Sequence, residues 1–408
     1  MNIRIYKSTL SGTACAPPSK SYAHRMLICA ALAEGRSRIN GISESEDMLA
    51  TLDCMSALGC IWKRDADEII TERSAPFEDA PDKIFYCRES GSTLRFFIPI
   101  AMALKGGGTF KGTQRLIERG AGIYGEVFAG HDVSIKTSPA ENTITVKGTL
   151  SSGTYRIRGD VSSQFISGLM FALSVCEGES RIEIIPPVES RPYIDITADS
   201  LRLFGAGVKM EDENVCIISG GGLKGRDVSV EGDWSNAAFL YAFNCAAGGN
   251  INVTGLSSES FQGDRICREL FERLKNAQGP IDISLCPDLG PVLFSAAAAM
   301  GCGAAFTGTR RLRIKESDRA AAMAQELLKF SIRCRVGEND MYICPGQLKA
   351  PKEPLNGHGD HRIVMSLALL SSITGGVIEG CEAVRKSWPE FFETMKSLGL
   401  KTEIINEF

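Results

Sequence analysis

The residues best suited to chemistry lie in three short segments where cations stand beside hydroxyl groups or carboxylates. The first is residues 17–25 (PPSKSYAHR), in which Lys20, Ser21 and Arg25 lead into an apolar run. Lysine and arginine donate charge-assisted hydrogen bonds to phosphate and carboxylate groups, and backbone N–H groups at a helix start add further donors. The segment predicts an anion-binding turn. The alternative is a helix that starts after the two prolines and exposes its cations to solvent.

The second segment, residues 313–319 (RIKESDR), places a carboxylate among cations. Lys315 and Arg319 are four residues apart, so on a helix they would face the same way, with Glu316 next to Lys315. This arrangement suits proton transfer on an anionic substrate, because the cations hold the ligand while the carboxylate moves protons. The alternative is a charged helix start that is simply solvated.

The third segment, residues 360–362 (DHR), follows a glycine-rich turn and precedes an apolar helix. Arg362 can bind a carboxylate or phosphate with two parallel hydrogen bonds, and Asp360 can cap the helix. The nearby pair His358 and His361 raises the question of a metal, but no cluster of further ligands accompanies it. We therefore expect no metal site.

These segments belong to a repeated pattern of elements. Six helix-length apolar runs, each ended by glycine and followed by a strand-like run, begin at His24, Thr93, Ser163, Ser235, Gly290 and His361. A second, amphipathic helix follows in most units, at residues 47–59, 194–207, 265–274, 319–330 and 389–399. The first set is apolar nearly all round and should be interior, and the second set should be outer. The pattern predicts an α/β protein built from six similar units.

The chemistry should collect at the polar starts of the buried helices, where unpaired N–H groups favour anions. The residues at these starts are Ser19–Ser21, Ser90–Ser92, Ser162–Gln164, Asp233, Asp288 and Asp360–Arg362. We expect these starts to converge on one cleft.

Composition limits the class of protein. The 408 residues carry 45 basic and 49 acidic side chains, a formal charge of −4, so an anionic ligand has to be held by a local cluster and nucleic-acid binding is not expected. The fourteen cysteines form no CxxC pair, and most lie in apolar segments, as is typical of free thiols in a reducing compartment. There is no secretory signal and no membrane span. The sequence predicts a cytoplasmic protein of two to four domains.

The motifs in combination resemble those of the enolpyruvyl transferases, in particular the branch that acts on shikimate 3-phosphate. The resemblance is collinear over nearly the whole chain. It rests on PSKSYAHR near residue 20, SGSTLR at 90–95, DVSSQF at 160–165, SRPYIDIT at 190–197, EGDWSNAAF at 231–239, Pro287-Asp288, RIKESDRAAAMAQEL from 313, GDHRIVM at 359–365 and RKSWPEFF from 385.

The resemblance implies a two-domain inside-out α/β barrel of six βαβαββ repeats, three per domain. One domain would be residues 20–229 and the other residues 1–19 plus 230–408, with hinge crossovers near 13–19 and 228–233 that close over substrate. It also implies transfer of the enolpyruvyl group of phosphoenolpyruvate to the 5-hydroxyl of shikimate 3-phosphate, through a tetrahedral intermediate that loses phosphate. A monomer without cofactor or metal is expected.

The site residues that the resemblance implies fall into three sets. Shikimate 3-phosphate would be bound by Lys20, Ser21, Arg25, Ser162, Ser163, Gln164, Ser190, Tyr193, Asp288 and Lys315. Phosphoenolpyruvate would be bound by Lys20, Gly91, Arg119, Gln164, Arg319, Arg362 and Lys386, with Arg385 as the rival of Lys386. Proton transfer would fall to Asp288 and Glu316, with Lys20 as a further candidate.

Some positions depart from the family pattern: Glu89 stands where asparagine is usual, Gly120 where proline is, Arg311 where asparagine or histidine is, and Pro18 where glycine is. Two alternative functions stay open. The branch acting on UDP-N-acetylglucosamine carries a reactive cysteine at about residues 114–119, and here no cysteine lies between Cys87 and Cys176. A non-catalytic anion-binding paralogue would have lost Lys20, Asp288 or Glu316, and all three are present.

Overall fold

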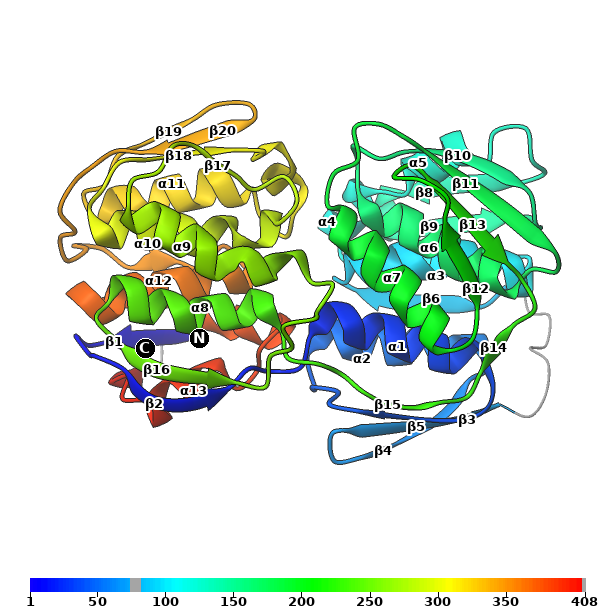
Figure 1. Ribbon diagram of the computed structural model, residues 1–408, viewed down its shortest axis with the longest axis horizontal. Coiled ribbons are helices and arrows are strands. Elements are labelled where there is room, and N and C mark those ends of the chain that lie inside the picture. The colour runs from blue at the N-terminus through cyan, green and yellow to red at the C-terminus, as the bar shows by residue number, and fades with distance from the viewer. Residues whose placement is uncertain (74–81, 406–408) are drawn as a thin grey trace. The chain divides into compact units, whose positions relative to one another are not determined.

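The computed structural model describes residues 1–73 and 82–405, and the chain divides into two compact units (Figure 1). Unit 1 consists of Met1–Ser19 together with the chain from Gly232 onward, and unit 2 is Lys20–Glu231. The boundary expected between residues 229 and 230 lies two residues before the observed one. In unit 1 the two connecting segments are tied together, because Pro18 and Gly232 form an antiparallel bridge and the Asp233 N–H donates to the Pro17 carbonyl at 2.7 Å.

The six apolar runs form the buried helices, three in each unit. Their bounds are α1 Lys20–Leu32, α3 Gly91–Lys105, α6 Ser163–Val175, α8 Trp234–Ala246, α10 Gly290–Met300 and α12 His361–Thr374. Helix α1 begins four residues earlier than the sequence indicated, at Lys20 instead of His24. The cationic turn is therefore part of the helix start itself.

The amphipathic runs form the outer helices, which bury one face and expose the other. Their bounds are α2 Glu46–Leu58, α7 Arg191–Leu203, α9 Cys267–Lys275, α11 Arg319–Lys329 and α13 Phe391–Ser397, with two short helices α4 Gln114–Arg119 and α5 Gly122–Val127 in unit 2. Single 3₁₀ turns occupy Pro139–Glu141, Gly263–Ile266, Pro287–Leu289, Arg310–Ile314 and Cys381–Lys386.

The helix expected at residues 319–330 corresponds to α11, but residues 313–318 do not extend it, so Lys315 and Arg319 do not lie on one helix. The 3₁₀ turn ends at Ile314, Lys315 has an extended backbone, and α11 begins only at Arg319. The cause is a cap: the Asp318 carboxylate accepts a hydrogen bond from the Ala321 N–H at 3.1 Å, which fixes the helix start after Asp318.

Outside residues 74–81, unit 2 contains three sheets. Two have four strands, in the orders β6 (Ile84–Arg88), β7 (Gly107–Gly112), β9 (Thr143–Lys147), β8 (Ser134–Ser138) and β10 (Thr154–Arg158), β11 (Glu179–Ile185), β13 (Val215–Ser219), β12 (Gly207–Met210). The third has the order β14 (Leu223–Lys224), β3 (Ala33–Asn40), β5 (Glu68–Arg73), β4 (Ile61–Asp65), with β15 (Asp227–Ser229) also pairing with β3.

Unit 1 also has three sheets in its described residues. Two have four strands, in the orders β17 (Ile281–Asp282), β18 (Ala304–Thr307), β20 (Asp340–Ile343), β19 (Cys334–Val336) and β21 (Leu355–Asn356), β22 (Gly376–Glu379), β1 (Asn2–Ile5), β23 (Thr402–Ile405). The third pairs β16 (Asn250–Thr254) with β2 (Ser11–Cys15).

Five of these sheets share one pairing pattern. The first two strands are parallel, and the third is antiparallel to both the second and the fourth, as for β10, β11, β13 and β12. In the sheet of β1, Ile3 lies opposite Ile378 on one side and Ile404 on the other. The N-terminal strand therefore closes a sheet made otherwise from the end of the chain.

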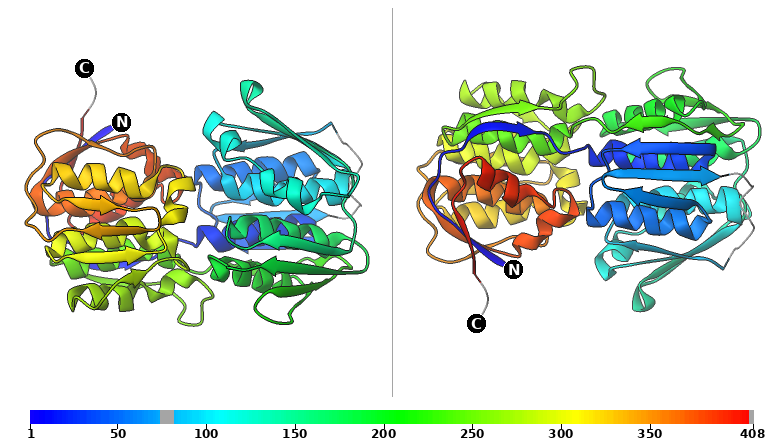
Figure 2. Two further views of the ribbon diagram at one scale, coloured as in Figure 1. Left: turned by 90° about the horizontal axis from the view of Figure 1, so that it is seen from above. Right: turned by 90° about the horizontal axis from the view of Figure 1, so that it is seen from below.

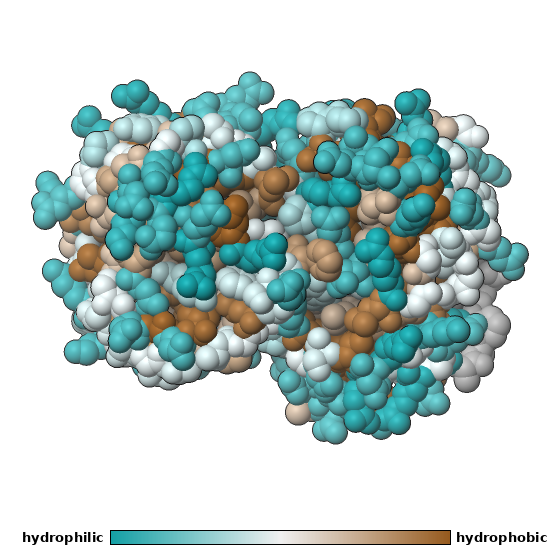
Figure 3. Space-filling model, in the orientation of Figure 1, coloured by the Kyte–Doolittle hydropathy of each residue, from teal (hydrophilic) through white to brown (hydrophobic). Residues whose placement is uncertain are grey.

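Each unit has its own hydrophobic core, built from its buried helices and the inward faces of its sheets. Figure 2 shows sheets lying against helices in both units. The face seen in Figure 3 is mostly hydrophilic, with small hydrophobic patches. Among residues 1–73 and 82–405, no helix combines the length and apolar character needed to cross a membrane, and no group of three or more metal-binding side chains is found.

Candidate active site

In unit 2, the helix starts that the sequence singled out carry the predicted hydroxyl and cationic groups. Ser90 caps α3, where its Oγ accepts from the Thr93 N–H at 3.3 Å, and Ser162 caps α6 in the same way with the Gln164 N–H at 3.3 Å. A capping hydroxyl satisfies only one of the N–H groups at a helix start. Each start therefore keeps its attraction for an anion.

Arg25 connects the starts of α1 and α7 through neutral oxygen atoms. Its guanidinium donates to Thr197 Oγ1 at 2.7 Å, the Ser21 carbonyl at 2.8 Å and the Tyr193 carbonyl at 3.0 Å. A weaker bond at 3.3 Å reaches Ser167 Oγ in α6. Burial lowers the pKa of Arg25 to about 10, so it remains protonated at neutral pH. The alternative of a solvent-exposed cation is excluded, because Arg25 is 3% exposed.

Lys20 and Ser190 complete this part of unit 2. Lys20 Nζ lies 2.9 Å from Asp47 Oδ2, in the first turn of α2, and both side chains are partly exposed. Ser190 is buried and precedes α7 with a left-handed backbone, φ +55°. The structure thus brings the predicted residues Ser21, Arg25 and Tyr193 together, with Ser190 at the adjoining helix start.

A second group of unit 2 forms around Gly91 at the start of α3. Gln164 accepts a hydrogen bond from Arg95 NH1 at 2.6 Å and donates to Ser92 Oγ at 2.9 Å. A Cβ atom placed on Gly91 would lie 2.7 Å from Arg95 NH1 and 3.2 Å from Arg119 NH2. Two guanidinium groups therefore approach this helix start closely, and a side chain at this position would require Arg95 to move.

In unit 1, Arg319 is the centre of a buried ion cluster. Its guanidinium donates to Asp360 Oδ2 at 2.8 Å, Asp288 Oδ1 at 2.8 Å and Glu316 Oε2 at 2.6 Å. Burial lowers the pKa of Arg319, but the three carboxylates outweigh burial and raise this pKa, Asp360 more than the other two. The side chain is 1% exposed, which excludes the alternative of a solvated charged helix start.

Asp288 joins the three cations of the cluster. It accepts from Lys315 Nζ at 3.1 Å and Arg362 NH2 at 3.4 Å as well as from Arg319. Burial raises the pKa of Asp288, but Arg362, Lys315 and Arg319 outweigh burial and hold this pKa well below its usual value. Lys315 and Arg319 therefore meet at Asp288, although they do not share a helix face.

Lys315 has a strongly shifted pKa. Burial lowers this pKa to about 8, the neighbouring Asp288 opposes the shift, and Arg319 and Arg311 add to it. A lysine with such a pKa changes its charge close to physiological pH.

The loop before α12 supplies the remaining predicted residues of unit 1. Asp360 caps α12 by accepting from the Arg362 N–H at 2.9 Å and accepts from Ser317 Oγ at 3.0 Å. Lys386 Nζ donates to the Gly359 carbonyl at 2.7 Å, whereas Arg385 is exposed. Of these two rivals, only Lys386 is recorded in contact with this loop.

Sequence reasoning missed three polar groups next to these residues. Arg95 and Asp47 touch the predicted Gln164 and Lys20, and Asp264 lies near Asp288. Burial, reinforced by Asp288, raises the pKa of Asp264 to about 7. Arg95 stands inside the quoted SGSTLR motif one helical turn after Gly91, so helical spacing was an available signal for it. No local sequence signal marks Asp47 or Asp264.

The departures from the family pattern lie at or beside the two groups. Gly120 ends α4 directly after Arg119 with φ +64°, a conformation that favours glycine. Arg311 is buried and acts electrostatically on Lys315, whereas Glu89 is exposed. Pro18 lies in the bridge to Gly232.

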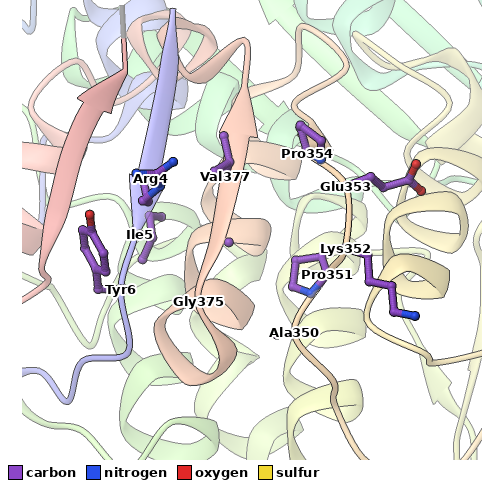
Figure 4. Close-up of a pocket in the computed structure, with 11 residues that line it drawn as sticks. Arg4, Ile5, Tyr6, Ala350, Pro351, Lys352, Glu353, Pro354, Gly375 and Val377 are labelled. Atoms are coloured by element: carbon purple, nitrogen blue, oxygen red, sulfur yellow. The ribbon is translucent and has the colours of Figure 1, made fainter.

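A surface pocket of about 350 Å³ in unit 1 is separate from these groups (Figure 4). It lies between β1, the start of β22 and the segment 350–354, and it is lined by residues such as Tyr6, Pro351 and Val377. It contains none of the residues predicted from the sequence.

Comparison with known proteins gives a consistent result over the full chain. Residues 6–395 match the family described as EPSP synthase (3-phosphoshikimate 1-carboxyvinyltransferase). A protein of Clostridium kluyveri named 3-phosphoshikimate 1-carboxyvinyltransferase is 38% identical, with 97% of each chain covered. A protein of the same name from Clostridium perfringens is 37% identical, also with 97% of each chain covered.

Solved structures agree with the sequence relatives. An EPSP synthase from Acinetobacter baumannii superposes with a TM-score of 0.78 at 25% identity, covering 99% of this chain and 100% of that one. The enolpyruvyl transferase NikO from Streptomyces tendae superposes with a TM-score of 0.75 at 15% identity, covering 98% of both chains, and so shares the fold.

Proposed function

The chain belongs to the EPSP synthase (3-phosphoshikimate 1-carboxyvinyltransferase) family, and from this membership we propose which of its residues perform each part of the family reaction. The enzyme transfers the enolpyruvyl group of phosphoenolpyruvate to the 5-hydroxyl of shikimate 3-phosphate and releases phosphate, a step in aromatic amino acid biosynthesis. The observation that carries this function is the collinear match over residues 6–395. It includes Lys20, Asp288 and Glu316, the three residues that a non-catalytic paralogue would be expected to have lost.

Shikimate 3-phosphate is bound mainly by unit 2 in this proposal. Arg25 supports this role because its recorded hydrogen bonds go to neutral oxygens, so its charge is available to attract an anion. The other residues of this set are Lys20, Ser21, Ser162, Ser163, Gln164, Ser190 and Tyr193, with Asp288 and Lys315 from unit 1. The hydroxyls supply short hydrogen bonds, and the cations offset the charge of the phosphate and carboxylate.

Phosphoenolpyruvate is bound by Lys20, Gly91, Arg119, Gln164, Arg319, Arg362 and Lys386. Two unit charges 5 Å apart repel by about 3 kcal/mol at an effective dielectric constant of about 20, so two phosphorylated acids need several cations between them. Gly91 supports this assignment, because Arg95 and Arg119 approach it at the start of α3, where backbone N–H groups also attract anions.

Glu316 and Asp288 divide the proton chemistry. The 5-hydroxyl oxygen adds to C2 of phosphoenolpyruvate while its proton passes to Asp288 and C3 gains a proton from Glu316. C3 then returns a proton to Glu316 while phosphate leaves and takes up the proton held by Asp288. Asp288 can be the acceptor because its pKa lies well below its usual value, so it is ionised before the reaction. An incoming carboxylate competes with Glu316 for Arg319 NH2, so substrate binding releases Glu316 to exchange protons at C3. Lys20 is the further candidate.

We also propose that the six sheets mark six βαβαββ repeats, three per unit, in an inside-out barrel. The shared pairing pattern of five sheets supports this. The segments near residues 13–19 and 228–233 are proposed as the hinge, and the enzyme as a monomer. Small-angle scattering with and without shikimate 3-phosphate tests the hinge, because an unchanged radius of gyration would count against it.

The function is tested by phosphate release from phosphoenolpyruvate in the presence of a metal chelator. We expect release that depends on shikimate 3-phosphate and appearance of the enolpyruvyl product by mass spectrometry. Phosphate release that depends on UDP-N-acetylglucosamine instead of shikimate 3-phosphate would indicate the activity of the other enolpyruvyl transferase branch. Absence of release with either acceptor, in a folded protein, would favour the non-catalytic role.

A further inference from the structure

Glu326, on the buried face of α11, is a carboxylate that the proposed reaction does not use. It is 2% exposed, and its Oε2 accepts from the Asn356 N–H at 2.9 Å and lies 3.0 Å from Lys329 Nζ. Its Oε1 lies 3.0 Å from His358 Nε2. Burial raises the pKa of Glu326, but the three donors outweigh burial and hold it below its usual value, so the carboxylate is ionised at neutral pH.

Two of the three partners of Glu326, Asn356 and His358, belong to the 356–360 loop, in which His358 has a strained backbone. His358 has φ +50° and Gly359 has φ +60°, and the left-handed conformation is uncommon for a residue other than glycine. The loop is tightened by the His358 N–H donating to Asn356 Oδ1 at 2.6 Å. Such a conformation persists only where the surroundings fix it. Glu326 supplies two of the contacts that do so.

The same loop holds groups of the candidate active site. The Gly359 carbonyl accepts from Lys386 Nζ at 2.7 Å, and Asp360 accepts from Arg319 Nε at 2.8 Å. Arg319 and Glu326 are seven residues apart on α11, which is close to two helical turns and places them on one face. Helix α11 therefore contacts the 356–360 loop at two points. Arg319 binds Asp360 inside the candidate active site, and Glu326 binds Asn356 and His358 outside it.

We propose that Glu326 and His358 are positioning residues that fix the 356–360 loop, so that Lys386 and Arg362 are held where phosphoenolpyruvate binds. The proposal rests on the proposed function for the roles of Lys386 and Arg362. Lys329 also contributes to positioning, because its Nζ donates to the carbonyl of Pro354 at 2.9 Å and so fixes the segment before the loop. This segment, residues 350–354, lines the pocket of Figure 4.

The experiment compares His358→Ala and His358→Gln with the wild type. Alanine removes the contact to Glu326, whereas the glutamine amide can donate from nearly the same place as Nε2. We expect His358→Ala to raise the KM for phosphoenolpyruvate about tenfold while the KM for shikimate 3-phosphate stays within twofold. His358→Gln should recover most of the loss. Gln325→Ala, at the exposed neighbouring position on α11, is the matched control and should behave as the wild type.

Glu326→Gln is the second variant, and thermal unfolding is followed for all of them. An unchanged KM for phosphoenolpyruvate in a folded, active His358→Ala would overturn the inference and leave the proposed function intact. Equal loss in both KM values together with a lower melting temperature would also overturn it, because that pattern indicates a purely structural role. A wild type without acceptor-dependent phosphate release would overturn the proposed function and this inference with it.

Discussion

Arg25 in unit 2 and Arg319 in unit 1 are both buried arginines near the start of a helix, but their charges are balanced in opposite ways. Arg25 donates to two backbone carbonyls and two hydroxyls, all neutral. Arg319 donates to three carboxylates. The positive charge of Arg25 is therefore not balanced by these partners, whereas the positive charge of Arg319 is balanced by its carboxylate partners.

The difference separates anion binding from proton chemistry. In unit 1 the cations Lys315, Arg319 and Arg362 stand against Asp288, Glu316 and Asp360, so the cluster is close to neutral. Carboxylates among cations can accept and return protons, whereas an arginine held by neutral groups attracts a phosphate. Unit 2 is therefore suited to bind an anion through Arg25, and the proposed proton transfer belongs to unit 1, whose cations are also proposed to bind phosphoenolpyruvate.

We expect the largest effect from removing Arg319, the central cation of the unit 1 cluster. Arg319→Met leaves three carboxylates without their common partner, among them the fully buried Asp360, and breaking a buried ion pair in this way costs about 3–5 kcal/mol of unfolding free energy. We expect turnover to be lost as well. Urea unfolding and phosphate release measure both effects, with Arg313→Met on the exposed side of the neighbouring turn as control. An Arg319→Met variant with wild-type stability and turnover would show that the Arg319 cluster is not needed for the reaction.

The Glu316→Gln variant tests whether the proton transfer at C3 depends on Glu316 of unit 1. Loss of a positioned acid or base lowers rates by roughly 10²–10⁴-fold. We expect kcat to fall within this range while the dissociation constant for shikimate 3-phosphate, measured by calorimetry, stays within twofold. A normal kcat would reassign the proton transfer at C3.

Arg25→Met tests the opposite half of the comparison. A hydrogen bond to a charged group contributes about 1.5–3 kcal/mol, so we expect affinity for shikimate 3-phosphate to fall by about 10–100-fold. The loss of stability should be smaller than in Arg319→Met, because only neutral oxygens are left without a donor. Equal destabilisation in the two variants would contradict the distinction drawn between the units.

The smallest expected effect concerns pH. Lys315 has a pKa lowered to about 8, so its positive charge is present below pH 8 and is lost as the pH rises through that value. We expect the KM for shikimate 3-phosphate to rise several-fold between pH 7 and pH 9, with no such rise in Lys315→Arg, because arginine stays protonated over this range. A flat profile in the wild type would place Lys315 outside the binding site.

The six apolar runs were readable from the sequence because helix burial has a local pattern. The expected glycine stop is the cap residue of α3, α10 and α12, whereas α1, α6 and α8 end before their glycines. Side-chain partners were less readable. Asp288 and Asp360 are 31 and 41 residues from Arg319, and no spacing rule links such distant residues. The helix start at Arg319 agrees with the expected run from residue 319, but the Asp318 cap leaves Lys315 outside this helix, and its charge spacing from Arg319 did not reveal that. The family resemblance includes Asp360 in the GDHRIVM motif, but it did not predict the ion pair between Asp360 and Arg319.

The place of β1 between β22 and β23 has a consequence for synthesis. Domains generally fold as units while the chain is made from its N-terminus. Unit 2 is contiguous and can be finished early, whereas the first strand of unit 1 has to wait for residues 376–405 before both of its edges are paired. A ribosome that stalls late would carry a finished unit 2 together with an N-terminal strand whose edges are still unpaired.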